Sequence, residues 1–172
     1  LMFALTAGYD TIYGANWSPD GKLVSYGCPD ATIHAIKIED GSEVLFNGAH
    51  SDWVLDTVFS KAGDHLVTVS RDRSMKLINV ETAQFIDNIT SITPGALKGG
   101  LHAVDRHPDK DELLAGGVDG VPRVYRMVRE KARKIGDDYN LIRAFPKLNG
   151  RVFSTRFSHD GTMIVAGSSY NG

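Results

Sequence analysis

The sequence lacks several features that mark particular classes of protein. Its single cysteine, Cys28, excludes an internal disulfide and a metal site built from several cysteines. No apolar run approaches the roughly 18 residues of a membrane-spanning helix. Basic and acidic side chains nearly balance, 19 against 21, so the net charge of −2 implies no general attraction to nucleic acid or to an anionic membrane. The first ten residues lack the basic start and continuous apolar segment of a signal peptide, and the start at Leu1 is consistent with a cut end.

What the chain does have is a globular composition rich in glycine. Its 172 residues are 42% hydrophobic and 23% charged, which argues against a mainly disordered chain. The length fits one domain of roughly 150 residues. Glycine occurs 18 times, against roughly 12 expected from an average usage near 7%. Many turns are therefore expected.

An internal repeat organises the chain. The segment Ala15–Ser25, with its Ser-Pro-Asp-Gly turn, returns three times in altered form. The anchor positions of the four copies lie 42, 47 and 51 residues apart: Ser18, Ser60, His107 and Ser158. Twelve residues beyond each anchor stand Asp30, Asp72, Asp119 and, breaking the pattern, Tyr170. Such a period predicts a repeat architecture.

Each repeat unit reads as four short antiparallel strands. Pro and Gly preset a tight turn between the first two strands, which predicts a hairpin. The second strand of each unit is a nearly continuous apolar run, as expected of a strand covered on both faces. We therefore predict an all-β fold, a β-propeller of four-stranded blades present as about three and a half blades of an incomplete ring. The predicted parts are an outer strand of a preceding blade (1–6), three blades (12–46, 54–89 and 101–145, the last with an inserted loop at 128–138) and a half blade (152–172).

With these residues in view, the chain resembles the WD40-repeat family of β-propellers. Gly48 and His50 stand where the family has its Gly-His pair, and Ser70 and Asp72 where it has its serine and turn aspartate. No unit keeps the Trp-Asp pair of the family. The resemblance implies a non-catalytic scaffold that binds a protein or peptide on one rim, with the remaining blades supplied by the same full-length chain and with no cofactor.

A narrower similarity is to bacterial WD40 segments that are often fused to a c-type cytochrome domain. It involves residues 71–89 and 95–123. The chain has no Cys-x-x-Cys-His haem motif, so any haem would lie outside this sequence. Fusion to a cytochrome domain favours the periplasm, and its absence favours the cytoplasm. The sequence leaves the compartment open.

His50, Ser70 and Asp72 form a set that looks catalytic, since a triad needs a nucleophile, a base and an orienting acid. In a blade the same residue types connect the loop before the first strand to the turn after the second. We expect Asp72 to accept from the His50 imidazole and His50 to meet the Ser70 hydroxyl. We therefore interpret the three as a structural network.

The loop and turn at the same rim carry the candidate partner-binding residues Asp52, Trp53, Arg71 and Arg73. Tryptophan and arginine are the side chains that most often dominate protein interfaces. An alternative role for Trp53 is a wedge between neighbouring blades. Both interpretations of Trp53 remain open at the level of sequence.

The inserted loop offers a second candidate site. Arg126, Arg129 and Arg133 belong to a basic cluster that predicts binding of a phosphate or an acidic segment. The adjacent Asp137 and the ordinary behaviour of charged loops favour a solvated surface instead. Few aromatic side chains are interleaved with these charges, which disfavours nucleic acid.

The competing functional class is a ligand-binding, metal-binding or hydrolytic propeller. Asp105, His107, Asp52 and His50 would then converge on the central channel. Strand alternation places Asp105 and His107 on one face. Two ligands fall short of the three or four that a zinc site needs. We therefore predict no metal site and no enzymatic activity.

Overall fold

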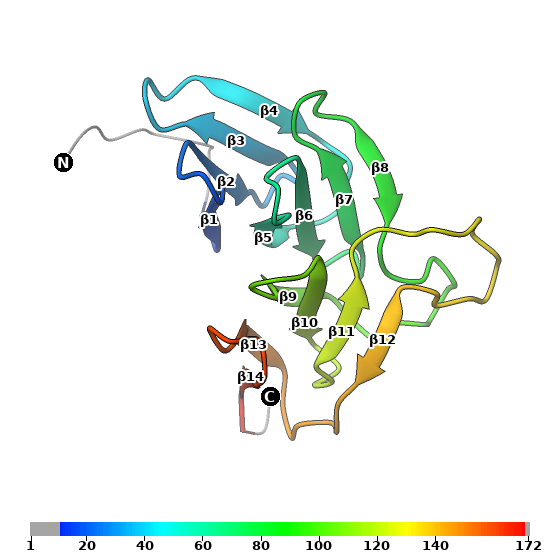
Figure 1. The fold of residues 1–172 in the computed structure, drawn as a ribbon. Helices are drawn as coiled ribbons and strands as arrows, with labels where there is room; N and C mark the ends of the chain where they lie inside the picture. The colour runs from blue at the N-terminus through cyan, green and yellow to red at the C-terminus, as the bar shows by residue number, and fades with distance from the viewer. Residues whose placement is uncertain (1–10, 171–172) are drawn as a thin grey trace.

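The structure, a computed structural model, describes residues 11–170 (Figure 1). The outer strand predicted at residues 1–6 lies outside these residues. The described part contains fourteen strands and no helix. The strands are β1 (Ala15–Trp17), β2 (Leu23–Gly27), β3 (Ile33–Lys37), β4 (Glu43–Asn47), β5 (Val54–Phe59), β6 (His65–Ser70), β7 (Met75–Asn79), β8 (Phe85–Asn88), β9 (Leu101–Arg106), β10 (Glu112–Gly117), β11 (Arg123–Arg126), β12 (Leu141–Ala144), β13 (Val152–Phe157) and β14 (Ile164–Ser168).

The strands form propeller blades in chain order. Three four-stranded antiparallel sheets, β1–β4, β5–β8 and β9–β12, are followed by a two-stranded sheet of β13 and β14. We call them the first to fourth blades. The structure thus shows the expected all-β propeller segment of three complete blades and one half blade.

The first strand of each blade lies at the inner edge of the array, and the fourth strand of each complete blade lies at the outer edge (Figure 1). The inner strands contact one another in the order β1, β5, β9, β13. Each also packs against the second strand of the preceding blade, as in the β2–β5, β6–β9 and β10–β13 contacts. Loops that precede the inner strands are therefore brought together although successive inner strands begin 39 to 51 residues apart in sequence.

The core lies between the blades. One buried cluster joins the first and second blades, including Ile33, Leu45, Phe59 and Ile78. A second joins the second and third blades and includes Met75, Leu101 and Tyr125. Burial on both faces follows from blade stacking, which removes apolar area from water on each side of a middle strand.

Two glycines permit this close stacking. A Cβ on Gly116 would lie 2.6 Å from Cγ1 of Val152, the first residue of β13. Gly27 meets Val54, the first residue of β5, in the same way. A side chain at either glycine would push the next blade away.

The fourth blade differs from the interior blades in the face that it leaves open. Val165 is 64% exposed, whereas Val67 and Leu114, at the same position of the repeat, are fully buried. Trp17 of the first blade is likewise 61% exposed. Within residues 11–170 the ring does not close, and the faces that a neighbouring blade would cover carry exposed apolar side chains.

Candidate docking site on the propeller rim

A repeated hydrogen bond builds the rim, which we define as the loops before the inner strands together with the turns after the second strands. The amide of Arg71 donates to the Trp53 carbonyl at 3.0 Å. The amide of Val118 bonds in the same way to Gly100 at 2.9 Å, and that of Ser169 to Arg151 at 3.0 Å. Each loop is therefore held against its own turn, and the rim side chains have a fixed base.

His50 lies at the centre of the network in the second blade. Its side chain is buried, and Nδ1 lies 2.8 Å from Oδ2 of Asp72. Nε2 lies 2.8 Å from the hydroxyl of Thr68. The expected contact of His50 with the Ser70 hydroxyl is wrong in this detail. Thr68 and Ser70 share a face of β6, and Thr68, two residues further from the turn, occupies the position next to the ring.

Ser70 has a different part in the same network. Its hydroxyl donates to the Asp52 carbonyl at 2.9 Å and accepts from the amide of Asp72 at 3.0 Å. The hydroxyl therefore ties loop to turn and does not meet an imidazole. No nucleophile–base pair is formed by Ser70 and His50, and the geometry required of a triad is absent from this set.

Asp72 receives donors from both sides. The amides of Ser51 and Ser74 donate to its carboxylate at 3.1 and 2.9 Å, and the Ser74 hydroxyl donates at 2.6 Å. Burial by itself raises the pKa of Asp72, but the hydrogen bonds from His50 and Ser74 outweigh burial and hold the pKa well below its usual range. The ionised carboxylate thus stabilises the rim of the second blade.

Trp53 is half-buried and lies between two partners. Its ring stacks on Tyr13, with centroids 5.6 Å apart and planes at 22°. The Arg71 guanidinium lies 4.6 Å from the Trp53 ring centroid, within cation–π range. Nε of Arg71 also lies 3.7 Å from Oδ2 of Asp52. Trp53 therefore contacts the segment before β1 and also presents one side to the rim.

A cavity of about 670 Å³ opens beside this cluster. It is lined by residues from all four blades: Tyr13, Asp52, Trp53, Leu55, Arg71, Gly100, His102, Val118, Arg151 and Phe153. The cavity thus brings together three of the four residues that we predicted for partner binding: Asp52, Trp53 and Arg71. Tyr13, Arg151 and Phe153 are members of the cavity that the sequence analysis missed.

The repeat register contains the signal for these missed residues. Tyr13, Leu55, His102 and Phe153 each stand five residues before the anchor of their unit, and Trp53, Gly100 and Arg151 each stand seven before it. Since equivalent positions of stacked blades meet at one rim, a residue that lines the cavity in one blade predicts its counterparts in the next.

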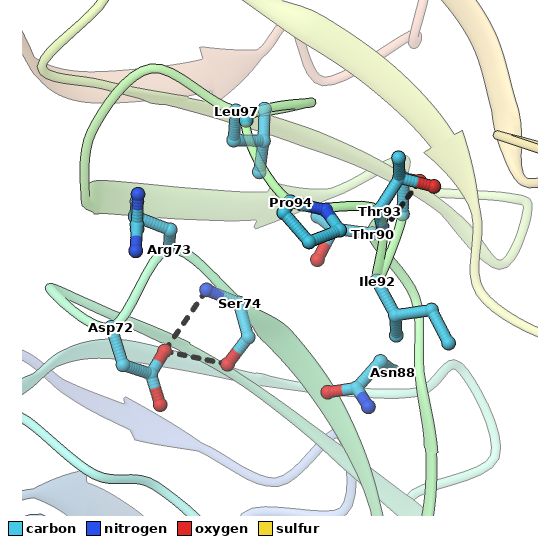
Figure 2. A pocket seen from close by; sticks show the side chains of 11 residues that line it. Asp72, Arg73, Ser74, Asn88, Thr90, Ile92, Thr93, Pro94 and Leu97 are labelled. Atoms are coloured by element: carbon cyan, nitrogen blue, oxygen red, sulfur yellow. Dashed lines mark hydrogen bonds between the residues drawn. The ribbon is translucent and has the colours of Figure 1, made fainter. Parts of the chain in front are cut away.

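Arg73 does not line this cavity. It borders a separate pocket of about 320 Å³, between the turn after β6 and the segment that follows β8. Figure 2 shows Arg73 at the edge of this pocket, across from Pro94, while Asp72 is engaged with Ser74. Arg73 has a positive φ of 71°, the left-handed conformation of this turn, and it lines a different pocket from Arg71.

The other two turn aspartates serve their own turns. Asp30 accepts from the Thr32 amide at 3.0 Å. Asp119 accepts from the Val121 amide at 3.0 Å and pairs with Arg123 at 2.7 Å. Neither carboxylate lines the rim cavity.

The arginines of the inserted loop are largely engaged inside the protein. Arg129 pairs with Asp137 at 2.6 Å, and Arg133 pairs with Asp87 of β8 at 2.8 Å. The Arg126 guanidinium lies 5.7 Å from the Tyr139 ring centroid. The pair of Arg133 with Asp87 fastens the loop to the second blade, and the two pairs neutralise two of the three charges that an anion site would use.

The alternative channel constellation does not converge. Oδ2 of Asp105 accepts from the Phe157 amide at 2.7 Å. Nδ1 of His107 accepts from the Asp109 amide at 3.1 Å. His50 and Asp52 belong to the rim network described above. No group of three or more metal-ligating side chains is found within residues 11–170. In the same range no helix is long and apolar enough to cross a membrane.

The sequence is similar to known proteins. The family model "WD domain, G-beta repeat" matches residues 41–79, from β4 of the first blade to β7 of the second. The chain is 28% identical to eukaryotic translation initiation factor 3 subunit I of Candida glabrata, over 64% of this chain and 30% of that protein. It is 26% identical to pre-mRNA-processing factor 19 of Oryza sativa subsp. japonica, over 95% of this chain and 29% of that protein.

A third relative is a component of chromatin assembly factor 1 of Mus musculus, 22% identical over 50% of this chain and 15% of that protein. The chain spans no more than 30% of the length of these three relatives. The repeat model matches the blade that carries His50 and Asp72, and the alignment with the second relative runs along nearly the whole chain. The stacked four-stranded blades and these matches agree: the chain carries a WD40 repeat at residues 41–79 and has the blade architecture of WD40-repeat β-propellers.

Proposed function

We propose that this chain is a non-catalytic interaction scaffold that docks a protein or peptide on the rim, through Asp52, Trp53 and Arg71, with Arg73 at the neighbouring pocket. The observation that carries the proposal is the cavity beside the Trp53–Arg71 cluster, whose walls come from four blades. A concave site with an aromatic side chain and a guanidinium on a rigid base has the composition of an interface anchor.

The relatives support binding as the type of function. Two of the three are named as parts of larger factors, one for translation initiation and one for chromatin assembly. Such components function through stable contacts with other chains. By analogy we assign this chain to the same general class.

The same proposal extends to the architecture beyond the described residues. We propose that further blades of the same polypeptide cover the open faces at Trp17 and Val165 and complete the ring. This proposal includes the blade extents expected from the sequence, 12–46, 54–89, 101–145 and 152–172. It also includes the similarity to bacterial WD40 segments. Closing the ring would bury both faces while leaving the rim accessible.

The proposal is tested with two alanine variants of the intact protein and a partner recovered from its native extract. Trp53→Ala and Arg71→Ala are each expected to weaken binding at least tenfold, since truncated tryptophan and arginine anchors commonly cost about 2 kcal/mol or more. Phe85→Ala and Arg143→Ala, on the exposed outer strands β8 and β12, are matched controls. Normal binding by both rim variants would overturn the proposal.

A further inference from the structure

We propose that the rim cavity recognises an acidic side chain, Asp or Glu, of the docked segment, and that Arg71 and Arg151 hold its carboxylate. This inference rests on the proposed function and specifies the chemistry of the partner. Arg151 was not among the residues that we singled out from sequence.

The charges around the cavity do not balance. Its lining contains two guanidinium groups, Arg71 and Arg151, and one carboxylate, Asp52. Arg151 is exposed and takes part in none of the ion pairs among residues 11–170. The site is therefore one negative charge short of neutrality, and a single carboxylate supplies that charge.

The ion pair of Arg71 with Asp52 leaves Arg71 available for a ligand carboxylate. Its Nε lies 3.7 Å from Asp52, beyond hydrogen-bond distance, and the two side chains are 47% and 38% exposed. An exposed pair of this kind contributes little. Its guanidinium can turn to a ligand carboxylate while Trp53 continues to support the guanidinium plane.

His102 lines the same cavity as the two arginines. Burial lowers the pKa of His102, and the charges of Arg151 and Arg71 lower it further. The imidazole therefore stays neutral near pH 7 and adds no third positive charge. Both arginines line the cavity with this ring, so a ligand in the cavity lies beside both positive charges. Nδ1 of His102 is also buried without a hydrogen-bond partner in the described residues, an unusual state for a purely structural side chain.

Aromatic walls strengthen the preference for an anion on an apolar stem. Phe153 stacks on His102 with centroids 5.3 Å apart and is still 57% exposed. Together with Tyr13 and Trp53 it gives the cavity an apolar surface that packs against the methylene groups of Asp or Glu and against a neighbouring apolar side chain. Low polarity around the guanidinium groups increases their attraction for a carboxylate.

The net charge also distinguishes a carboxylate from a phosphate. A phosphorylated side chain carries about −1.5 to −2 charges near pH 7, which exceeds the single unbalanced positive charge of the lining and adds repulsion from Asp52. We therefore commit to an unmodified acidic residue as the occupant.

The probe for this inference is a display library of random 12-residue peptides, selected on the intact protein and measured by fluorescence anisotropy. We expect the selected peptides to share an Asp or Glu next to an apolar residue. Replacing that acid by its amide, or Arg151 by Gln, is expected to weaken binding at least tenfold, and the two changes together little more than either alone. Rising salt is expected to weaken binding of the acidic peptide. Arg143→Gln is the matched control for loss of an exposed arginine.

Each contrary outcome has a distinct meaning. Peptides that bind through Trp53 but are indifferent to Arg151→Gln overturn the acidic-residue assignment and leave rim docking intact. Tighter binding when phosphoserine replaces the acid shows that the site is built for phosphate. A selection that returns no peptide sensitive to either Trp53→Ala or Arg151→Gln overturns both this inference and the proposed function.

Discussion

The second and third blades hold the loop before their inner strand in two chemically different ways. Four residues before the inner strand, the second blade has His50 and the third has Leu97. His50 is buried and bonds to Asp72 and Thr68. Leu97 is also buried, but it packs in the apolar cluster that contains Met75 and Leu101.

The strand residues that surround His50 also differ between the two blades. Thr68 and Ser70 of the second blade correspond in register to Ala115 and Gly117 of the third, which have no hydroxyl to offer. The turn aspartate of the third blade, Asp119, pairs instead with Arg123 of its own blade. The comparison shows that a polar network is one solution for holding a rim loop and that apolar packing is another. The two solutions differ in their response to mutation and to pH.

The largest expected effect on stability is at Leu97, the apolar residue that holds the loop of the third blade. Leu97→Ala removes a buried side chain and leaves a cavity, so the free energy of unfolding should fall by about 2 kcal/mol or more. Urea denaturation measures this loss. Ile92→Ala, in the same loop but 51% exposed, is the control and should change stability little. A loss below about 0.5 kcal/mol for Leu97→Ala would mean that the loop is held by other contacts.

His50, the polar residue that holds the loop of the second blade, is expected to contribute slightly less to stability. His50→Ala leaves Asp72 and Thr68 without a partner, and loss of a hydrogen bond to a charged group costs about 1.5–3 kcal/mol. Thermal or urea unfolding at pH 7 measures the effect, with His159→Ala on an exposed turn as the matched histidine control. Equal stabilities of the two variants would contradict the network seen around His50.

Low pH should affect the polar network at Asp72 but not the apolar packing at Leu97. Because the pKa of Asp72 is lowered in the folded protein, its contribution is fully present above the unfolded value near 4 and is lost as the pH falls toward the folded value. The stability difference between wild type and Asp72→Asn should therefore shrink below about pH 4. The difference between wild type and Leu97→Ala should not follow this titration. Parallel pH profiles for the two variants would argue against an ionised Asp72.

The smallest expected effect is at the third-blade turn. Asp119→Ala removes an ion pair within one turn and strand, whose side chains are 13% and 16% exposed. Arg123 keeps its hydrogen bond to the Val121 carbonyl in this variant, so we expect a loss of about 1 kcal/mol. A loss as large as that of His50→Ala would show that the pair with Arg123 replaces the histidine network in strength as well as in position.

The repeat register made much of the fold predictable. Anchors such as Ser60 and turn residues such as Asp72 recur at fixed spacings, and tight turns with apolar strands have local causes in the sequence. The four antiparallel strands expected for each repeat unit are those of the three complete blades.

The candidate site was less predictable because its contacts connect residues of different blades. The pairing of Arg133 with Asp87 depends on how an inserted loop folds back over β8, which no local pattern encodes. The cavity at Trp53 likewise needs the curvature of four stacked blades to bring Arg151 near Arg71. The choice of Thr68 over Ser70 as partner of His50 depends on the depth of the ring in the blade.

Rim docking is tested most directly by site-specific photo-crosslinking of the intact protein in its native extract. A photoreactive phenylalanine analogue replaces Phe153 in the rim cavity or, as the matched aromatic control, Phe85 on the outer strand β8. Docking at the rim predicts a crosslink to one defined protein from position 153, lost when Arg71 and Arg151 are both changed to Gln, and no crosslink from position 85. A specific crosslink from position 85 with none from position 153 would contradict it.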